Sequence, residues 1–538
     1  MQQSYDARAT VATAPTTRPT SRTYQNPITE EAAPVENGYR YDSFPGYSTA
    51  ITPGLNGVAP TGKVKGTRAL APDLLRGLLM MIMAFDHAAL TLRTWEHGTG
   101  RLPESDGTVI RDWNFATAYI VRTLTHLCAP GFTFLLGMGV VYLGRSRTKL
   151  GWGSMQLARY LAIRCVVLTI ITAVFGAVVT GGRFWFMNAV LFALAVDYLL
   201  AGLLWLVMNR TEPLLSHGIL KLRQRWAAAV IDAAPEHDSD EESMMQPLLP
   251  GRSATRAGMA SDYISWMIHN ALLLVLCMVT ILWNMWLSDD GGVCKQPIST
   301  TMQSPRHPLL RIWFWVMMDP DSRIMSGFPP LAWLSFAVLG ILYGRILTAR
   351  PWSHHALVLG HASAAVSFTI FFILTRILRF GNLSEGCLQT PDQLRLPQQN
   401  PYLGSLASFF YVVKYPPDVA FFALTMAGNM MLMAVLTAVP PSAGKRLTML
   451  LDFGTSALFF YIMHMLILLG LGSILVALFG HDLGKPDPMD PGKPARGIDS
   501  LWAYFTFWAA VMLILWPLCR SYSRFKSTKA ADSIWRLF

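Results

Sequence analysis

An arginine, an aspartate and a histidine bracket an apolar run in the segment RGLLMMIMAFDH, residues 76–87. Each residue of an α-helix turns about 100° and rises about 1.5 Å, so Arg76 and His87 share one face about 16 Å apart. Ionisable groups inside a membrane-spanning helix are costly and usually face a cavity or a partner. His87 is therefore a candidate general base, and Asp86 is placed to orient a ring.

The start of the same helix carries a second pair of charges. Asp73, three residues before Arg76, falls near the stripe that Arg76 shares with His87, so the two side chains can form an ion pair. Arg76 is therefore a candidate for binding an anionic ligand. The alternative is an arginine that extends to the lipid headgroups and pairs with Asp73.

Two more histidines lie within apolar segments. His126 lies early in an apolar block, and Pro130 and Gly131 just after it predict a kink that lines a cavity. We consider His126 as an assistant to His87 in catalysis. His464, near the middle of another block, is a candidate substrate contact. A buried histidine that only bonds a backbone carbonyl is the alternative for both.

Basic residues also lie between two later apolar blocks, at Arg376, Arg379 and Lys414. They either anchor the chain at the membrane interface or bind an anionic or sugar substrate. No cluster of histidine, cysteine and carboxylate residues has the spacing of metal ligands, so no metal is expected. Neither a phosphate-binding glycine loop nor a Gly-x-Ser-x-Gly turn occurs in a suitable context.

The elements that position these residues are membrane-spanning helices. The chain has 538 residues, of which 52% are hydrophobic and 14% charged, whereas soluble proteins carry about a quarter charged residues. About 20 consecutive apolar residues span a bilayer as a helix. We therefore predict an all-α, polytopic integral membrane protein with about ten transmembrane helices. Their approximate limits are 70–92, 119–143, 160–180, 184–208, 264–287, 328–348, 354–378, 418–438, 453–479 and 500–519.

The distribution of lysine and arginine predicts how the chain is oriented. These residues gather at alternate connections between the blocks, which places both termini in the cytoplasm. The protein is expected in the plasma membrane or in an endomembrane such as that of a vacuole. The net charge of +11 follows this bias, and nucleic-acid binding is not expected. Asn382 begins a glycosylation sequon on the non-cytoplasmic side. Cys294 and Cys387 lie in two loops on that side, where a disulfide can persist.

The polar segments divide the chain into three parts. Residues 1–66 are rich in Thr, Ala, Pro, Ser and Gly without apolar periodicity, which predicts a disordered tail. Residues 67–522 form the transmembrane domain, interrupted at 209–262 by a cytoplasmic loop that we also predict to be disordered. Residues 523–538 are predicted to be a cytoplasmic tail.

Five blocks of sequence follow one another in the order of a known family. They are DLLRG with MAFDH (73–87), THLCAPGF to Gly137, FPPLAW (328–333) to Gly340 and Gly344, KYPPD (414–418), and the run from Phe453-Gly454 to His464. Over about residues 68–520 the chain resembles the transmembrane acyltransferase superfamily, which includes heparan-α-glucosaminide N-acetyltransferase and its bacterial and fungal relatives. Arg76 and His87 match the family's Arg-x10-His signature. The lysosomal enzyme has Asn in place of His87, and its own catalytic histidine corresponds only approximately to His97.

The resemblance implies an acyltransferase that moves an acetyl group from cytosolic acetyl-CoA to an acceptor amine or hydroxyl on the non-cytoplasmic side, such as that of a sugar or glycan. Acetyl-CoA is then a co-substrate, and no cofactor is bound. Arg76 and Asp73 contact the donor, and His87 deprotonates the acceptor or carries the acetyl group covalently. The alternatives are a proton-coupled secondary transporter and a non-catalytic multi-pass protein. A homodimer is compatible with each.

Overall fold

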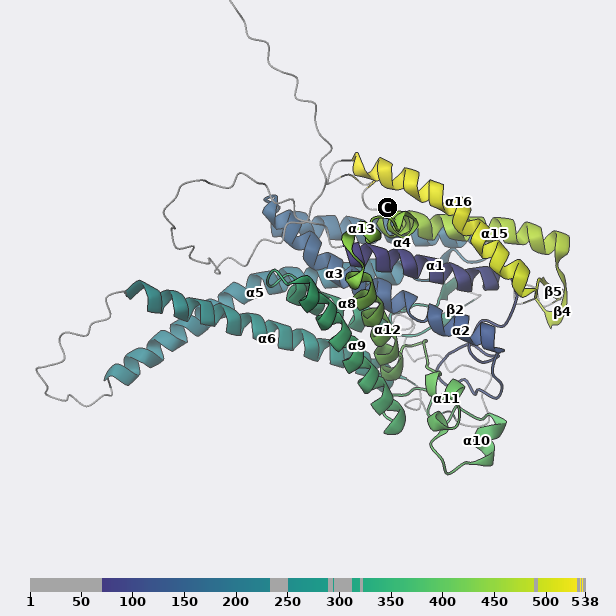
Figure 1. The fold of residues 1–538 in the computed structure, drawn as a ribbon, viewed down its shortest axis with the longest axis horizontal. Coiled ribbons are helices and arrows are strands. Elements are labelled where there is room, and N and C mark those ends of the chain that lie inside the picture. Colours follow the sequence, from purple (N-terminus) through teal and green to yellow (C-terminus); the bar gives the residue numbers. More distant parts are fainter. Residues whose placement is uncertain are drawn as a thin grey trace, which may run out of the picture. The chain divides into compact units, whose positions relative to one another are not determined.

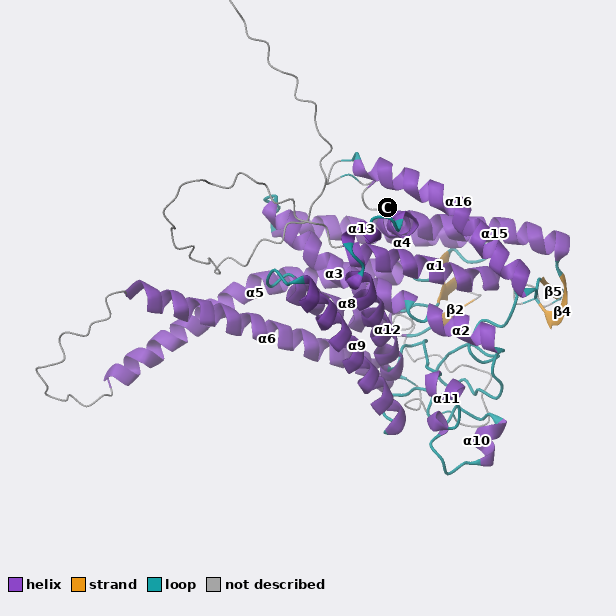
Figure 2. Cartoon of the chain, in the orientation of Figure 1, coloured by secondary structure: helices purple, strands orange, loops and turns teal. Residues whose placement is uncertain are grey.

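Ten helices in the described part of the chain are long and apolar enough to span a membrane. The structure, a computed structural model, describes residues 70–232, 250–288, 294, 312–319, 323–487, 492–529, 533 and 535. Helices make up nearly all of its regular structure (Figure 1, Figure 2). The protein is an all-α polytopic membrane protein, so the predicted fold class is confirmed. The predicted tail at 1–66 lies outside the described residues.

Most spans begin and end within a few residues of the predicted limits, because apolar length defines both. The first span is helix α1 (Leu70–Leu92). The second is formed by two helices end to end, α2 (Ala116–Thr125) and α3 (Cys128–Lys149). The others are α4 (Ser154–Val179), α5 (Leu191–Asp232), α6 (Pro250–Leu287), α8 (Pro330–Leu347), α9 (His354–Ile377), α12 (Val419–Ala438), α15 (Ala457–Phe479) and α16 (Leu501–Ser527).

Short helices and strands occupy the connections. The helical pieces are α10 (Pro391–Arg395), η2 (Pro401–Leu403), α11 (Leu406–Phe410), α13 (Pro441–Gly444) and α14 (Thr448–Thr455). Two small sheets are present: β1 (Phe186–Asn188), β2 (Met317–Asp319) and β3 (Ile324–Ser326) in one, β4 (His481–Pro486) and β5 (Pro494–Gly497) in the other. Strand β3 lies between β1, to which it is parallel, and β2, to which it is antiparallel, and β4 pairs with β5 antiparallel.

The prediction of a disordered loop at 209–262 is wrong for its described parts. Helix α5 continues to Asp232 and α6 already begins at Pro250, while 233–249 lie outside the described residues. Side chains beyond the apolar part of each helix hold the two together. The Ser216 hydroxyl donates to Asp262 at 2.5 Å, and the Ser265 hydroxyl donates to the Glu212 carbonyl at 2.7 Å. The predicted tail at 523–538 likewise begins inside α16, which ends at Ser527.

The second span is interrupted between α2 and α3, where Pro130 predicts a kink. Proline has no N–H to donate to the carbonyl four residues earlier, which here belongs to His126, and its ring displaces that carbonyl. The break falls at His126 and Leu127, and the Leu127 N–H donates to the Leu124 carbonyl at 3.2 Å in a tighter turn. The helix is thus interrupted four residues before Pro130, with His126 at the break itself, and the predicted cavity beside it stays a prediction.

Glycines allow two pairs of helices to pack backbone against backbone. A Cβ atom on Gly77 would lie 1.9 Å from the Leu450 carbonyl oxygen, and one on Gly454 would lie 2.0 Å from the Asp73 carbonyl oxygen. Helix α14 therefore crosses α1 in direct contact. A Cβ on Gly340 of α8 would lie 2.1 Å from the carbonyl oxygen of Phe134 in α3. Small residues at such crossings are typical of membrane helices.

Two loop segments, 93–115 and 378–418, pack together at the end of the bundle where α1 ends, and we call them the cap. The Ile110 N–H donates to the Cys387 carbonyl at 2.9 Å, and the Gln389 N–H donates to the Ile110 carbonyl at 2.9 Å. A small apolar core lies between the segments, formed by Ile110, Leu383, Leu388, Tyr402, Tyr411 and Val413.

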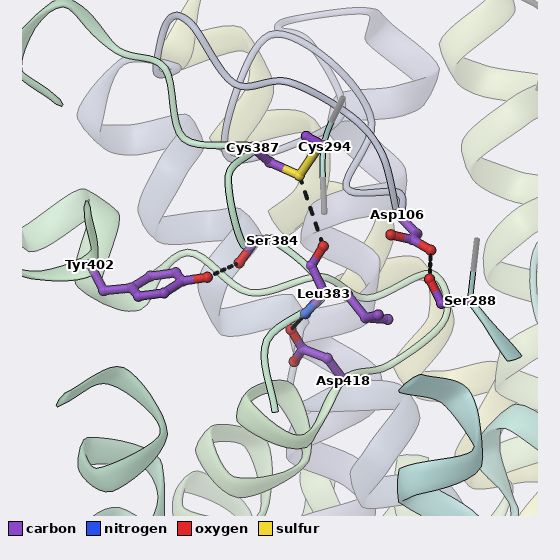
Figure 3. The surroundings of a disulfide bond; sticks show 8 residues. All are labelled: Asp106, Ser288, Cys294, Leu383, Ser384, Cys387, Tyr402 and Asp418. Atoms are coloured by element: carbon purple, nitrogen blue, oxygen red, sulfur yellow. Dashed lines mark hydrogen bonds between the residues drawn. A yellow bond between two sulfur atoms is a disulfide. The ribbon is translucent and has the colours of Figure 1, made fainter. Parts of the chain in front are cut away.

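The predicted disulfide between Cys294 and Cys387 is present, with 4.9 Å between the Cα atoms. It ties the connection after α6 to the cap (Figure 3). A hydrogen bond between Ser288 and Asp106 makes a second link from that connection to the 93–115 segment. The cap is thus fixed to the bundle from several sides.

Candidate functional site

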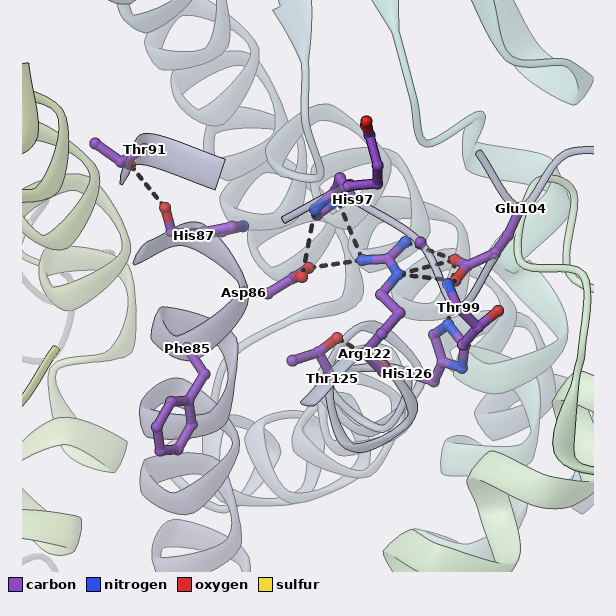
Figure 4. A network of polar contacts seen from close by, with 12 residues as sticks. Phe85, Asp86, His87, Thr91, His97, Thr99, Glu104, Arg122, Thr125 and His126 are labelled. Atoms are coloured by element: carbon purple, nitrogen blue, oxygen red, sulfur yellow. Dashed lines mark hydrogen bonds and ion pairs between the residues drawn. The ribbon is translucent and has the colours of Figure 1, made fainter. Parts of the chain in front are cut away.

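A buried arginine joins two carboxylates from different segments (Figure 4). The Arg122 side chain of α2 is 2% exposed. Its Nε and Nη2 atoms donate to the Glu104 carboxylate at 2.7–3.0 Å, and its Nη1 donates to Asp86 Oδ2 at 2.6 Å. Glu104 belongs to the cap and also accepts the Thr99 N–H at 2.9 Å. These charge-assisted bonds fix the cap on the first two spans.

Two histidines flank this ion network. Nε2 of His97 lies 3.1 Å from Arg122 Nη1, and because arginine can only donate, that nitrogen accepts and Nδ1 carries the proton. Nδ1 of His97 faces Asp86 Oδ1 at 3.4 Å. On the other side, Nε2 of His126 lies 3.2 Å from Glu104 Oε2. The protonation of both rings is assigned from these partners.

The pKa values of His97 and Glu104 in the ion network are shifted from their ordinary values. Burial lowers the pKa of His97 to about 4, and the nearby cations Arg122 and Lys414 act in the same direction. Burial alone would raise the pKa of Glu104, but Arg122 outweighs it and holds that pKa well below its ordinary value. At neutral pH His97 is therefore uncharged and Glu104 ionised. Arg122 then lies between the two carboxylates of Asp86 and Glu104 and bonds to both.

A second polar centre is the pair formed by His87 of α1 and the buried His464 of α15. Nδ1 of His464 lies 3.0 Å from the Phe460 carbonyl oxygen, which only accepts, so this Nδ1 is protonated and Nε2 accepts. Nδ1 of His87 lies 2.8 Å from that Nε2 and must donate. The neutral His87 ring therefore has an unprotonated Nε2. This nitrogen has no hydrogen-bond partner among the described residues.

Arg76 and Asp73 form the ion pair that their spacing predicts. Nη1 of Arg76 lies 3.1 Å from Asp73 Oδ1 and also donates to the Gly454 carbonyl at 3.2 Å. These contacts lie where α14 crosses α1, so Arg76 stabilises the crossing. Its predicted contact with an acyl donor stays a prediction.

Lys414 lies close to the ion network. Its side chain is buried, and Nζ lies 5.4 Å from the centre of the Phe328 ring and 5.1 Å from that of Tyr415. Because its charge contributes to lowering the pKa of His97, it belongs to the same region of the protein. A role in substrate binding stays a prediction.

Arg376 and Arg379 make their contacts within the cap instead. Arg376 is fully buried, and its guanidinium donates to Asn382 Oδ1 at 2.7 Å and to the Tyr411 carbonyl at 2.5 Å. Arg379 is exposed and pairs with Glu385. In the described part of the chain, neither arginine contacts the ion network or the histidine pair. Both arginines thus contribute to the stability of the cap, and the substrate contact predicted for them stays a prediction.

The predicted glycosylation site does not fit the fold. Asn382 is 3% exposed, and its Nδ2 donates to the carbonyls of Thr375 at 2.9 Å and Phe380 at 3.2 Å. An N-linked glycan is attached to this nitrogen and needs access to solvent. The sequon is therefore structural, and we expect it to be unoccupied.

The sequence interpretation missed two members of the ion network, Glu104 and Arg122, and gave His97 only a doubtful place. Arg122 is an ionisable residue in an apolar block, which is itself a sign of a buried partner. Glu104 lies in a polar loop with no pattern that marks it. The pairing of Arg122 with Glu104 depends on the fold of the cap, which the sequence does not reveal.

Fold and site together define a class: a multi-pass helical protein with buried ionisable side chains within its spans. Comparison with protein-family models and with curated proteins finds no match for this chain. The resemblance to the transmembrane acyltransferase superfamily therefore rests on the five sequence blocks alone. Packing accounts for part of them, because Gly77, Gly340 and Gly454 occupy helix crossings.

Proposed function

We propose that this protein is a membrane-embedded acyltransferase that moves an acetyl group from acetyl-CoA to an acceptor amine or hydroxyl. One observation carries the proposal. The hydrogen bonds from His87 to His464 and from His464 to the Phe460 carbonyl leave Nε2 of His87 unprotonated, and this nitrogen has no partner in the part of the chain that the structure describes. An imidazole held in one tautomer by the partner of its other nitrogen is the arrangement that general-base catalysis requires.

In the proposed reaction, Nε2 of His87 accepts the proton of the acceptor as the acceptor's nitrogen or oxygen attacks the thioester carbonyl. The carbon–sulfur bond breaks, and the coenzyme A thiolate leaves and takes that proton from His87. Asp86, the adjacent residue, carries negative charge near the imidazolium that forms between the two steps. A base of this kind typically contributes about 10²–10⁴-fold in rate.

The donor is proposed to enter from the other end of α1. Arg76 lies about 16 Å from His87 along the helix axis, by the rise of an α-helix, and Asp73 orients it. The basic connections at that end favour the cytoplasm, where acetyl-CoA occurs, and the disulfide favours a non-cytoplasmic cap. Acetyl transfer would then cross the bilayer, in the plasma membrane or an endomembrane.

The test is acetyl transfer by purified protein from radiolabelled acetyl-CoA. His87→Gln should reduce transfer at least about 100-fold at unchanged abundance and melting temperature. His269→Gln is the matched control, since His269 is also buried and also bonds a carbonyl, that of Ser265 at 2.8 Å, but lies in α6. Normal turnover in His87→Gln would remove His87 from the mechanism.

A second measurement separates direct transfer from a covalent acetyl-histidine. Protein incubated with labelled donor in the absence of acceptor is denatured and separated from free label. Label bound to wild-type protein and absent from His87→Gln supports the covalent route. Label that never stays on the protein during active turnover supports direct transfer. If neither transfer nor labelling occurs, the acyltransferase proposal is refuted, and the transporter and the non-catalytic protein remain.

A further inference from the structure

We propose that the outer end of α5, residues 213–229, is a docking helix for an acidic protein that binds helices in an apolar groove, the class to which calmodulin belongs. Helix α5 has 42 residues and is therefore about 63 Å long, whereas the hydrocarbon core of a bilayer is about 30 Å thick. The polar run Asn209-Arg210-Thr211-Glu212 ends its apolar part. The docking helix thus lies outside the membrane, and it has no part in the proposed acyl transfer.

One face of the docking helix is apolar and exposed. This apolar stripe consists of Leu215, Ile219, Leu222 and Trp226, whose spacing of four, three and four residues places them within about 60° around the helix. Leu222 and Trp226 are 57% and 70% exposed, and in Figure 1 the outer end of α5 lies apart from the other helices. Apolar anchors at this spacing are what a protein with a helix-binding groove recognises. Exposed apolar patches of this kind mark interaction sites.

Basic side chains flank the apolar stripe on both sides. At 100° per residue, Lys221 and Arg225 lie on one side of it and Arg223 on the other. Residues 213–231 contain no aspartate or glutamate, and in the part of the chain that the structure describes none of these three cations pairs with a carboxylate. The partner that complements this face therefore has acidic side chains around an apolar groove.

The membrane surface does not fit as the occupant of the stripe. Trp226 follows Arg210 by 16 residues, which corresponds to about 24 Å along the helix, and about 18 Å remain if the helix is tilted by about 40°. The headgroup layer on one side of a bilayer is only about 5–8 Å thick. The helix continues through Pro213 without a break. It therefore carries Trp226 away from the lipid.

A second copy of the chain is also a poor occupant. A two-fold pairing places the same surface on both sides of the interface, so the cations that flank one stripe would face those that flank the other. An acidic groove has the opposite charge. In calmodulin-type proteins Ca²⁺ opens a groove that is rich in methionine, a flexible side chain that adapts to the shape of its ligand. The basic connections at this end of the bundle favour the cytoplasm, where such a partner is accessible.

The experiment uses full-length protein in nanodiscs of phosphatidylcholine and immobilised calmodulin as the probe, with Ca²⁺ or with a chelator. Binding should require Ca²⁺ and weaken as the salt concentration rises. Trp226→Ala should weaken it about 30-fold or more, as is typical of a buried tryptophan anchor. The matched control is Trp286→Ala, since Trp286 is 67% exposed at the opposite end of α6.

A pair of charge variants tests the flanking cations. Lys221→Gln/Arg225→Gln should slow association with calmodulin, because these charges attract the acidic partner. Arg101→Gln/Arg111→Gln, at two exposed positions of the cap, should associate at the wild-type rate. Equal rates in the two double variants would show that the cations do not take part and would overturn the charge complementarity on which the proposal rests.

Two outcomes of the binding assay also overturn the proposal: no Ca²⁺-dependent binding by well-folded protein, and equal affinity of Trp226→Ala and Trp286→Ala. Hydrogen exchange of peptides from residues 213–229, measured without calmodulin, tests the two rival occupants. Slower exchange in nanodiscs that contain phosphatidylserine assigns the stripe to the membrane surface. Slower exchange at higher protein concentration assigns it to a second copy. Either result replaces the acidic protein as the partner.

Discussion

Replacing Arg122 with leucine is the sharpest test of the ion network. The change removes every hydrogen bond that this guanidinium donates to Glu104 and Asp86. Both carboxylates then remain in place with side chains 0% and 9% exposed. Breaking a buried ion pair by removing one partner costs about 3–5 kcal/mol. We therefore expect the melting temperature of Arg122→Leu to fall by several degrees in detergent.

A double-mutant cycle shows whether uncompensated charge is the cause. Glu104→Leu alone leaves Asp86 as the only carboxylate bonded to Arg122, and the double variant Arg122→Leu/Glu104→Leu removes the charges of Arg122 and Glu104 together. The double variant should lose less stability than the sum of the single variants, because no glutamate is left without its cation. Arg159→Leu, at an exposed position of α4, is the control and should melt like the wild type.

When the pH is lowered, the contribution of Glu104 to the melting temperature should fall in the wild type and rise in Arg122→Leu. In the wild type the pKa of Glu104 is held well below its ordinary value, so its contribution to stability is present above that ordinary value and lost as pH falls. Without Arg122, burial raises the pKa of Glu104, so protonation of the folded state relieves the cost as pH falls. Acid should thus partly rescue Arg122→Leu. An unchanged melting temperature, or additive losses in the cycle, would refute the reasoning.

Four further predictions concern a helix crossing, the disulfide, the sequon and His97. Gly454→Val should strongly reduce folded yield because a Cβ would lie 2.0 Å from the Asp73 carbonyl, while Gly470→Val, where a Cβ meets nothing within 4 Å, should not. Limited proteolysis should cleave the cap of Cys294→Ser as fast as it cleaves the cap of wild-type protein whose disulfide has been reduced. A reducing agent should not increase cleavage of the variant further. Asn382→Gln should leave gel mobility unchanged and cost about 1–3 kcal/mol, since buried hydrogen bonds are lost; a mobility shift would show a glycan. Because the pKa of His97 is lowered to about 4, the folded state loses stability as the pH falls from about 6.5 toward 4. The difference in melting temperature between pH 7 and pH 5 should therefore be smaller in His97→Gln than in the wild type.

The sequence predicts the membrane spans well because their cause is local. About 20 apolar residues in a row suffice to define a span, and the first span is predicted at its observed limits, Leu70–Leu92. The break at His126 also has a local cause, the missing N–H of Pro130. The helical segments 209–232 and 250–262, which lie outside the predicted spans, have a non-local cause. Ser216 and Asp262 stabilise them only when the two helices lie together, and no single stretch of sequence encodes that.

The parts of the site that the sequence predicts also have local causes, and the parts that it misses depend on contacts between distant segments. Periodicity placed His87 on the face of α1 that reaches a partner, and the pairing of Asp73 with Arg76 follows from helical spacing. That the partner of His87 is His464, 377 residues away, depends on how α15 packs on α1. Asn382 illustrates the converse error. Its sequon is a correct local pattern, and the fold of the cap buries it.

The ion network and the pair of His87 and His464 differ in their hydrogen bonding. This difference indicates which of the two would react with a ligand. In the ion network Arg122 bonds directly to both carboxylates, so the main effect of the network is to fix the cap on α1 and α2. In the histidine pair, hydrogen bonds run from His87 through His464 to a carbonyl, and within the described ranges Nε2 of His87 has no partner. A proton or an acyl group can satisfy that nitrogen. Substitutions in the network should therefore act first on stability, and substitutions at His87 first on turnover.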